Sequence, residues 1–231
     1  MRHARSIRYF CIVPIFLGSI IYQYAYSQSE QFLKLPAHTH YKMVTWWDSV
    51  YRFSNFQVGT ITFRTGFSPP GTTKLNYNFY FGQIDMINLQ GDTLQVTPSN
   101  EIKLIEIGGT VFLYASRIGY VEILGQSPVA LGVFNILVTE KMVVDLQDRG
   151  AVSTDVRGQM SDYDRYYKKT RTYFFIDKGD KLHKAIKPSI LKLFPGHNAS
   201  IKAYLRKNYI DFNQEKDLVQ LLNFCNQLEQ P

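Results

Sequence analysis

The chain has 231 residues, 45% of them apolar and 15% aromatic, and a formal net charge of +7. Arg2, Arg5 and Arg8 precede every Asp and Glu, so loss of an amino-terminal leader leaves 23 basic against 19 acidic residues. The remaining charge of +4 is too small for a nucleic-acid-binding surface, and no nucleic acid is expected as a partner. The same modest excess leaves peripheral contact with an anionic membrane open.

Residues 1–27 read as a secretory signal peptide. The three arginines form a basic start, residues 9–21 form an apolar run, and Ala25-Tyr26-Ser27 is a small-residue cleavage site before Gln28. The apolar run of 13 residues is shorter than the roughly 20 that span a bilayer as a helix. We therefore expect an exported protein, periplasmic or secreted after cleavage near Ser27 and Gln28. An uncleaved anchor is the alternative.

Cysteine usage limits how the mature protein is stabilised. Cys11 lies in the leader, so Cys225 is the one thiol that remains after cleavage. No intramolecular disulfide can then form, even in an oxidising compartment. The fold must depend on its apolar core, and about 204 mature residues supply enough apolar surface for one large or two small domains.

Residues 28–54 are predicted to form an amino-terminal arm. His38 and His40 lie two positions apart, so in an extended strand they share a face and could ligate one metal ion. No third ligand follows from the spacing, and two solvated histidines are the simpler interpretation. The pair is kept as a candidate metal site, and no cofactor is expected.

Residues 55–177 are predicted to form an antiparallel β domain. Short β-branched and aromatic runs are separated there by turn residues such as Pro69-Pro70-Gly71 and Gly108-Gly109. This pattern is typical of strands joined by tight turns. We expect eight strands in the first part of the domain, at residues 58–64, 74–80, 83–88, 93–97, 102–107, 110–114, 119–124 and 129–141.

Alternation within these strands predicts a core on one side of the sheet. Leu75, Tyr77 and Phe79 fall on one face, whereas Asn76 and Asn78 fall on the other. No helical pattern separates the strands. We therefore expect an α+β fold in which a curled antiparallel β-sheet, a half-barrel or sandwich-like meander, precedes a C-terminal bundle of about three short helices.

Residues 146–172 are predicted to be an excursion between strands, ahead of a last strand at 173–176. Aromatic and basic residues are interleaved there, a mixture that could stack on sugar rings. We take four of them as candidate ligand-binding residues: Tyr163, Arg165, Tyr166 and Tyr167. A glycan is the expected ligand in an exported protein. A solvated charged loop is the simpler interpretation of the same stretch.

Residues 178–231 are predicted to form a helical tail in three short pieces. Ile190 and Phe194 lie on the apolar edge of the first piece, which Pro195-Gly196 ends. Asn198 and Asn213 are expected to cap the second and third pieces. Apolar residues at helical spacing mark the third piece, namely Leu218, Leu221, Leu222, Cys225 and Leu228.

Several turns and element edges carry a family resemblance. They are Phe56-Gln57-Val58-Gly59, Leu75-Asn76-Tyr77-Asn78, Gly91-Asp92-Thr93-Leu94, the hairpin at 102–112 and Leu191-Lys192-Leu193-Phe194-Pro195. Together they resemble an uncharacterised family of exported proteins of Bacteroidota with a β-rich body and a short helical C-terminal tail. The resemblance covers residues 53–124 and 173–228. That family has no established activity, so the resemblance implies no functional residues.

The common catalytic motifs are missing from the sequence. It contains no phosphate-binding loop, dinucleotide fingerprint, zinc-protease helix or nucleophile elbow. Ser189-Ile190-Leu191-Lys192 matches the Ser-x-x-Lys of penicillin-interacting enzymes, but the accompanying Lys-Thr-Gly element is missing. We therefore expect a non-catalytic binding or structural accessory module of the cell envelope, with an envelope protein, a glycan or a lipid as its partner.

Two alternatives to this function stay open. A hydrolase or transferase acting on envelope glycans would need catalytic side chains that converge in space from separate strands. A lipid-binding carrier would hold an acyl chain on the concave face of the curled sheet.

Overall fold

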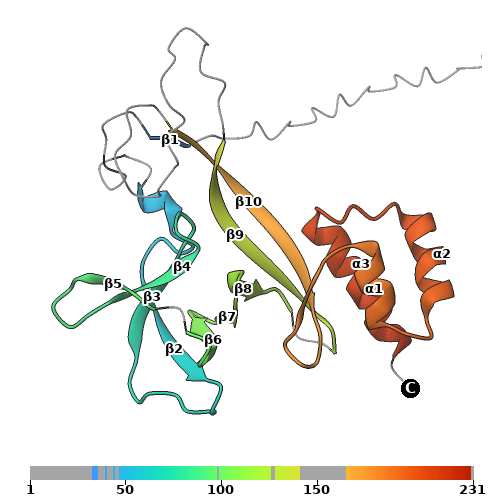
Figure 1. Ribbon diagram of the computed structural model, residues 1–231, viewed down its shortest axis with the longest axis horizontal. Coiled ribbons are helices and arrows are strands. Elements are labelled where there is room, and N and C mark those ends of the chain that lie inside the picture. Colours follow the sequence, from blue (N-terminus) through green and yellow to red (C-terminus); the bar gives the residue numbers. More distant parts are fainter. Residues whose placement is uncertain are drawn as a thin grey trace, which may run out of the picture. The chain divides into compact units, whose positions relative to one another are not determined.

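The computed structural model describes residues 33–35, 40, 44, 47–97, 99–125, 128–140 and 165–229 (Figure 1). The predicted signal peptide, His38 and Tyr163 lie outside the described residues. Among the described helices, none is both long and apolar enough to cross a bilayer.

The described strands form one large antiparallel sheet of eleven strands, most of which belong to two meanders. The first meander comprises β2 (Gln57–Phe63), β3 (Thr73–Asn78), β4 (Gln83–Ile87) and β5 (Thr93–Gln95). The second comprises β6 (Ile102–Ile107), β7 (Thr110–Ala115), β8 (Gly119–Ile123), β9 (Ala130–Glu140) and β10 (Arg165–Ile176). The pairing of β2 with β6 joins the two meanders.

The eight strands predicted up to residue 141 are confirmed, with ends that differ from the prediction by at most two residues. Turn glycines explain this agreement. Gly108 and Gly109 have φ values of 53° and 82° and close the β6–β7 hairpin. A side chain at either position would oppose that left-handed backbone, so the Gly-Gly pair fixes the turn in the sequence.

The sheet is neither closed nor strongly curled, so the expected half-barrel is wrong. Strong curvature of a sheet needs bulges or glycine kinks at repeated positions. The described ladders contain one register shift, between Thr62 and Phe63. The concave surface that the lipid-carrier alternative required is therefore not formed by the described strands.

Three parts of the sheet differ from the prediction. β1 (Leu33–Leu35) lies in the predicted arm and pairs with β10. β10 begins at Arg165 rather than at residue 173, so the excursion is shorter than expected. β11 (Leu182–Lys184) also pairs with β10, where a helical tail was expected. Basic residues fall on both faces of 165–172, at 165, 168, 169 and 171, and hide the period of two. Pairing with β9 nevertheless continues over residues 166–176 of β10.

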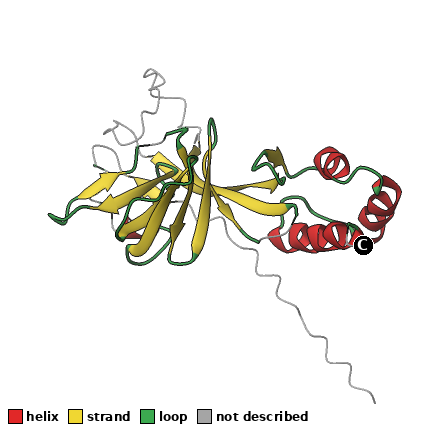
Figure 2. Ribbon diagram, turned by 90° about the horizontal axis from the view of Figure 1, so that it is seen from below, coloured by secondary structure: helices red, strands yellow, loops and turns green. Residues whose placement is uncertain are grey.

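Three helices follow the sheet (Figure 2), as predicted: α1 (Lys187–Leu193), α2 (Asn198–Asn208) and α3 (Glu215–Leu228). A short 3-10 helix, η2 (Trp47–Val50), precedes β2. The predicted caps are wrong, because His197 and Gln214 occupy the N-cap positions of α2 and α3 and neither makes a side-chain cap hydrogen bond. Asn213 instead donates to the Asp211 carboxylate in the preceding turn, at 3.2 Å.

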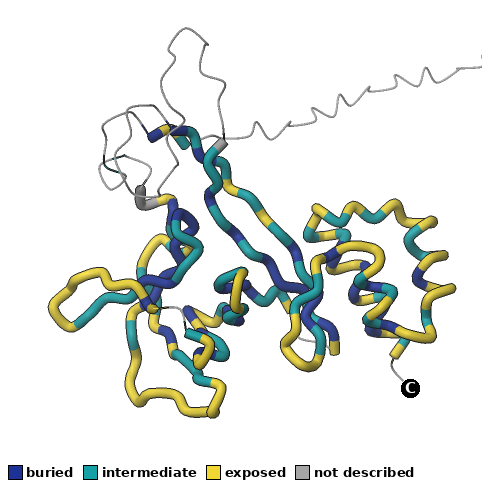
Figure 3. Tube along the Cα trace, viewed as in Figure 1, coloured by how far each residue is buried: buried dark blue, intermediate teal, exposed yellow. Residues whose placement is uncertain are grey.

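Two clusters of buried side chains stabilise the fold. The sheet core includes Tyr77, Ile84, Ile105, Phe112, Tyr120, Leu137 and Tyr167. The helix core includes Leu131, Val133, Tyr173, Phe175, Phe194, Ile201, Leu218, Leu221 and Cys225. Each fully buried apolar side chain contributes roughly 1.5–3 kcal/mol. Strands β9 and β10 supply residues to both cores, and Figure 3 shows buried positions along both strands.

Candidate functional site

Polar side chains interrupt the apolar face of β8, β9 and β10 where the two cores meet. Paired residues of antiparallel strands share a face, and Arg171 on β10 pairs with Asn135 on β9. Lys169 lies two positions before Arg171 on the same face, and Glu122 on β8 pairs with Val133 of the helix core. We call Glu122, Asn135, Lys169 and Arg171 the polar seam.

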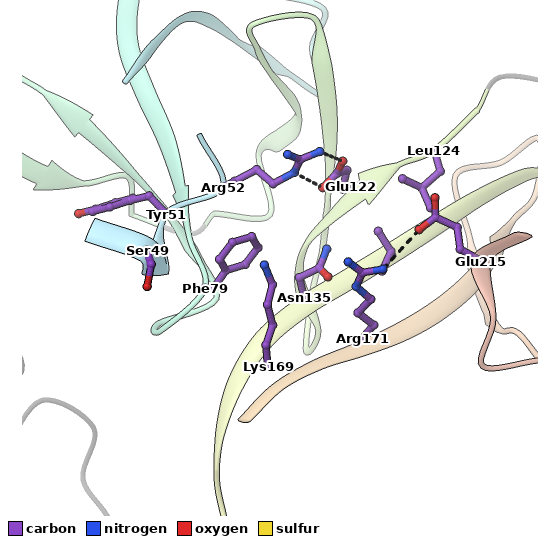
Figure 4. A pocket seen from close by; sticks show the side chains of 11 residues that line it. Ser49, Tyr51, Arg52, Phe79, Glu122, Leu124, Asn135, Lys169, Arg171 and Glu215 are labelled. Carbon is purple, nitrogen blue, oxygen red and sulfur yellow. Dashed lines mark hydrogen bonds and ion pairs between the residues drawn. The ribbon is translucent and has the colours of Figure 1, made fainter. Parts of the chain in front are cut away.

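The polar seam lines a cavity of about 480 Å³ (Figure 4). This volume lies within the range of sites for small organic ligands. Further walls come from segments far apart in the sequence, through Arg52 after η2, Phe79 after β3, Leu124 after β8 and Glu215 at the start of α3. Ionisable side chains from several elements therefore converge on one hollow.

Arg52 and Glu122 form a two-point ion pair on the cavity wall. Arg52 Nε donates to Glu122 Oε2 at 3.0 Å, and Arg52 Nη2 donates to Glu122 Oε1 at 2.9 Å. The Glu122 side chain is only 8% exposed. Its hydrogen bond to the guanidinium raises the pKa of Arg52 above the ordinary arginine value. Each carboxylate oxygen of Glu122 thus already accepts a charged hydrogen bond, which is the strong kind.

The sequence motif Leu75-Asn76-Tyr77-Asn78 places Arg52 at the cavity. The Asn76 side chain accepts from the Phe53 backbone N–H at 3.1 Å and donates to the Phe53 carbonyl at 2.8 Å. Arg52 itself donates its backbone N–H to the Tyr77 carbonyl at 2.9 Å. The buried amide of Asn76 therefore bonds both backbone groups of Phe53, as the backbone of a neighbouring strand would, and so fixes the chain next to Arg52.

Tyr77 of the same motif supports the polar seam from behind. Its hydroxyl donates to the backbone carbonyl of Asn135 at 2.6 Å, and its ring stacks on Phe112 with the centroids 5.2 Å apart. Asn135 as a whole residue is only 8% exposed. Its side chain points into the cavity (Figure 4). No described residue hydrogen-bonds to the Asn135 side-chain amide. The amide can therefore form hydrogen bonds with a molecule bound in the cavity.

Lys169 is the cation of the cavity that lacks a carboxylate partner among the described residues. Its Nζ lies 3.3 Å from the centroid of the Phe79 ring, a cation–π contact. The side chain stays exposed to the cavity. Partial loss of hydration in the hollow, together with the positive charges of Arg171 and Arg52, lowers the pKa of Lys169 from 10.5 to about 8, and the charge of Glu122 offsets only part of this shift.

Arg171 is held only loosely. Its Nη1 lies 3.7 Å from Glu215 Oε2, and the two side chains are 56% and 46% exposed. Exposed single-point ion pairs of this kind contribute at most about 1 kcal/mol. A ligand carboxylate could therefore replace Glu215 at small cost.

The residues predicted as ligand-binding do not line this cavity. Tyr163 lies outside the described residues, and Arg165 is buried on β10. Tyr167 is buried in the sheet core, where its hydroxyl lies 3.0 Å from the Tyr80 hydroxyl. Tyr166 is partly exposed, with Lys34 Nζ 5.8 Å from its ring centroid. Their role in binding stays a prediction.

The predicted metal site falls mostly beyond what the structure describes. His38 lies outside the described residues, whereas His40 is described and partly buried. Among the described residues, no three His, Cys, Asp or Glu side chains group as metal ligands would. The His38–His40 pair stays a prediction.

Sequence reasoning missed the polar seam, although a signal for it is present. Three neighbouring strands each carry polar side chains at inward positions flanked by apolar ones. Asn135 lies between Val133 and Leu137, and Glu122 lies between Tyr120 and Leu124. Lys169 and Arg171 lie likewise between two tyrosines. An inward polar residue on adjacent strands indicates a buried polar site.

Comparisons with known proteins give no further evidence on function, so the proposal below is argued from the geometry of the cavity. No protein-family model, curated protein or solved structure matches the chain. The resemblance to exported proteins of Bacteroidota stays a prediction.

Proposed function

We propose that this protein is an exported, non-catalytic binding module of the cell envelope, and that its cavity binds an anionic group of the ligand, most simply a carboxylate. Export is supported by the leader pattern of residues 1–27. The choice of an anion is supported by the charges of the cavity. Three cations line the cavity, namely Arg52, Lys169 and Arg171, against the two carboxylates Glu122 and Glu215. Glu122 is already paired with Arg52.

One observation carries the proposal. The Lys169 ammonium opens into the cavity beside Arg171, and no carboxylate of the described residues pairs with it. A cation in a partly dehydrated site raises the free energy of the empty protein. A bound anion supplies the missing partner, and the Asn135 amide adds a donor and an acceptor for neutral groups nearby.

The cavity supports binding better than it supports the two alternatives. Glycoside hydrolysis needs one carboxyl group that can give up a proton and a second that can attack or activate water. Both oxygens of Glu122 already accept hydrogen bonds from Arg52. Ser189, the other catalytic candidate, lies on α1 and does not line the cavity. An acyl chain would meet charged walls.

Calorimetric titration with a small carboxylated sugar tests this function. We expect D-galacturonate to bind the purified protein and the uncharged sugar D-galactose to bind at least about tenfold more weakly, since one charged hydrogen bond contributes about 1.5–3 kcal/mol. Lys169→Met keeps an unbranched side chain that is one atom shorter and removes its charge. This variant should lose about tenfold or more in affinity for galacturonate.

Lys168→Met is the matched control, because successive residues of β10 point to opposite faces of the sheet. It removes an equal charge one residue away and should bind galacturonate as the unmodified protein does. Equal loss in the two variants would show a general charge effect and sink the cavity proposal. Binding of galactose as tight as that of galacturonate would also do so.

A further inference from the structure

The segment from Lys181 to Ile210 carries formal charge of one sign only. It forms β11, α1, α2 and the turns between them, and it contains no Asp or Glu. All seven of its lysine and arginine residues are exposed, namely Lys181, Lys184, Lys187, Lys192, Lys202, Arg206 and Lys207. Whichever way each of these side chains points, the surface of the segment is positive. We call residues 181–210 the basic segment.

The cations of the basic segment have no acidic partner within the described part of the chain. No carboxylate there forms an ion pair with any of the seven. Cations that precede the segment are paired, since Arg171 lies 3.7 Å from Glu215 and Lys178 lies 3.8 Å from Glu229. Unpaired like charges add up to a positive potential at the surface. The basic segment therefore attracts anions from outside the chain.

Helix stability accounts for only part of this charge. Lys192 in the last turn of α1, and Arg206 and Lys207 in the last turn of α2, offset the helix dipole. Lys187 begins α1, where a cation opposes the dipole, and Lys202 lies in the first half of α2. A partner that carries negative charge explains these two positions, whereas the helices themselves do not.

Helix α2 presents its cations on the side turned away from the helix core. Ile201 is buried in that core, and the Tyr204 ring stacks on Phe224 with the centroids 4.1 Å apart. Lys202 and Arg206 are four positions apart, so they share a face of α2, and both are exposed. α2 also lies farther from the sheet than α1 and α3 (Figure 1). A flat anionic surface can thus approach this face of α2 without meeting the strands.

Two exposed side chains with apolar surface accompany the cations. Tyr209 is 89% exposed and occupies the C-cap of α2, on a left-handed backbone with a φ of 47°. Ile186 is 41% exposed and occupies the N-cap of α1. Tyrosine is favoured where a membrane meets water, because its ring is apolar and its hydroxyl is polar. A membrane offers both anionic headgroups and an apolar layer, whereas a soluble polyanion leaves these two side chains in water.

We propose that the basic segment binds the surface of a membrane that contains anionic phospholipids. Lipid phosphates pair with the cations of α2, and the Tyr209 ring enters the headgroup layer. No residue of the basic segment lines the cavity of the polar seam, so this is a second binding site. It goes beyond the proposed function, because it attaches the protein to a membrane whether or not the cavity is occupied.

Cosedimentation with lipid vesicles tests the membrane site. Vesicles of phosphatidylcholine with about 30% phosphatidylglycerol should bind the protein at least about tenfold more tightly than vesicles of phosphatidylcholine alone. Lys202→Gln combined with Arg206→Gln should weaken this binding by about tenfold or more. Lys74→Gln combined with Arg117→Gln is the matched control, since it removes one exposed lysine from β3 and one exposed arginine from the β7–β8 turn. The control should bind nearly as the unmodified protein does.

Tyr209→Ser distinguishes a membrane from a soluble polyanion. It should weaken binding to the anionic vesicles by about threefold or more and leave binding of inorganic polyphosphate unchanged. Unchanged vesicle binding in this variant would show that charge alone acts, and would overturn the lipid surface as partner. Equal loss in the two double variants, or no binding to the anionic vesicles, would also overturn it. Lys169→Met should bind vesicles normally, so this inference and the proposed function can fail separately.

Discussion

Protonation of Lys169 has opposite effects on the stability of the empty protein and on its affinity for an anion. Its pKa in the folded protein is about 8, against 10.5 for an ordinary lysine. Below pH 8 the ammonium is charged in the folded and unfolded states, and its unfavourable effect on stability is fully present. Between pH 8 and 10.5 the unfolded state binds more protons, so this group makes the free energy of unfolding rise with pH. Anion binding follows the opposite trend, because only the ammonium attracts the ligand.

Cys225 offers a second prediction at the level of one residue. The thiol is fully buried in the helix core, and burial raises its pKa to about 12. Because the thiolate is the reactive form, we expect the folded protein to react with a thiol reagent such as DTNB far more slowly than the urea-unfolded protein does. Labelling in native buffer at the unfolded rate would contradict the burial of this face of α3.

At the level of elements, one buried polar side chain adds hydrogen bonds to the apolar packing that attaches α3 to the sheet. Asn226 Oδ1 accepts from the Val129 backbone N–H at 3.3 Å, and Asn226 Nδ2 donates to the Val129 carbonyl at 3.2 Å. Val129 directly precedes β9, the strand that carries Asn135 of the polar seam. The helices are thus tied to the strand that lines the cavity.

Asn226→Ala should destabilise the protein by about 1–3 kcal/mol, because it leaves the buried backbone groups of Val129 without these partners. Urea unfolding followed by circular dichroism measures the change. Asn223→Ala on the exposed side of α3 gains the same helix propensity and should shift stability by no more than about 0.5 kcal/mol. Equal effects of the two substitutions would mean that Asn226 does not hold α3 on the sheet.

The strands were predictable from local chemistry, whereas the long final strand was not. Glycine and proline between apolar runs mark β2 to β9 in the sequence, because few other residues fit those turns. In β10, Lys169 and Arg171 occupy inward positions and disguise the alternation. Only pairing with β9, a tertiary effect, identifies residues 165–172 as strand.

The cavity was harder to predict for the same reason. Arg52 reaches Glu122 across 70 positions of sequence, and it does so because Asn76 fixes the Phe53 backbone. Such long-range placement has no local pattern. The inward polar residues Glu122 and Asn135 were visible once β8, β9 and β10 were aligned as a meander, and they are the part of the site that sequence could have supplied.

Across the whole molecule, the two cores and the cavity are built on the same two strands, β9 and β10. The apolar face of β9 and β10 serves the sheet core at one end and the helix core at the other, and the polar seam lies between them. Polar side chains at such a border cost stability unless they are hydrogen-bonded or paired, and a bound anion would supply a partner for Lys169. The formal net charge of +7 also favours encounter with an anionic ligand.

The pH dependence of galacturonate affinity tests the central claim most directly. The sugar carboxylate stays ionised from about pH 6 to pH 9.5, so any change in affinity comes from the protein. We predict constant affinity up to about pH 7, a fall as Lys169 loses its proton around pH 8, and a flat profile for Lys169→Met. A flat profile for the unmodified protein, or the same fall in Lys169→Met, would contradict the assignment of the anion site to Lys169.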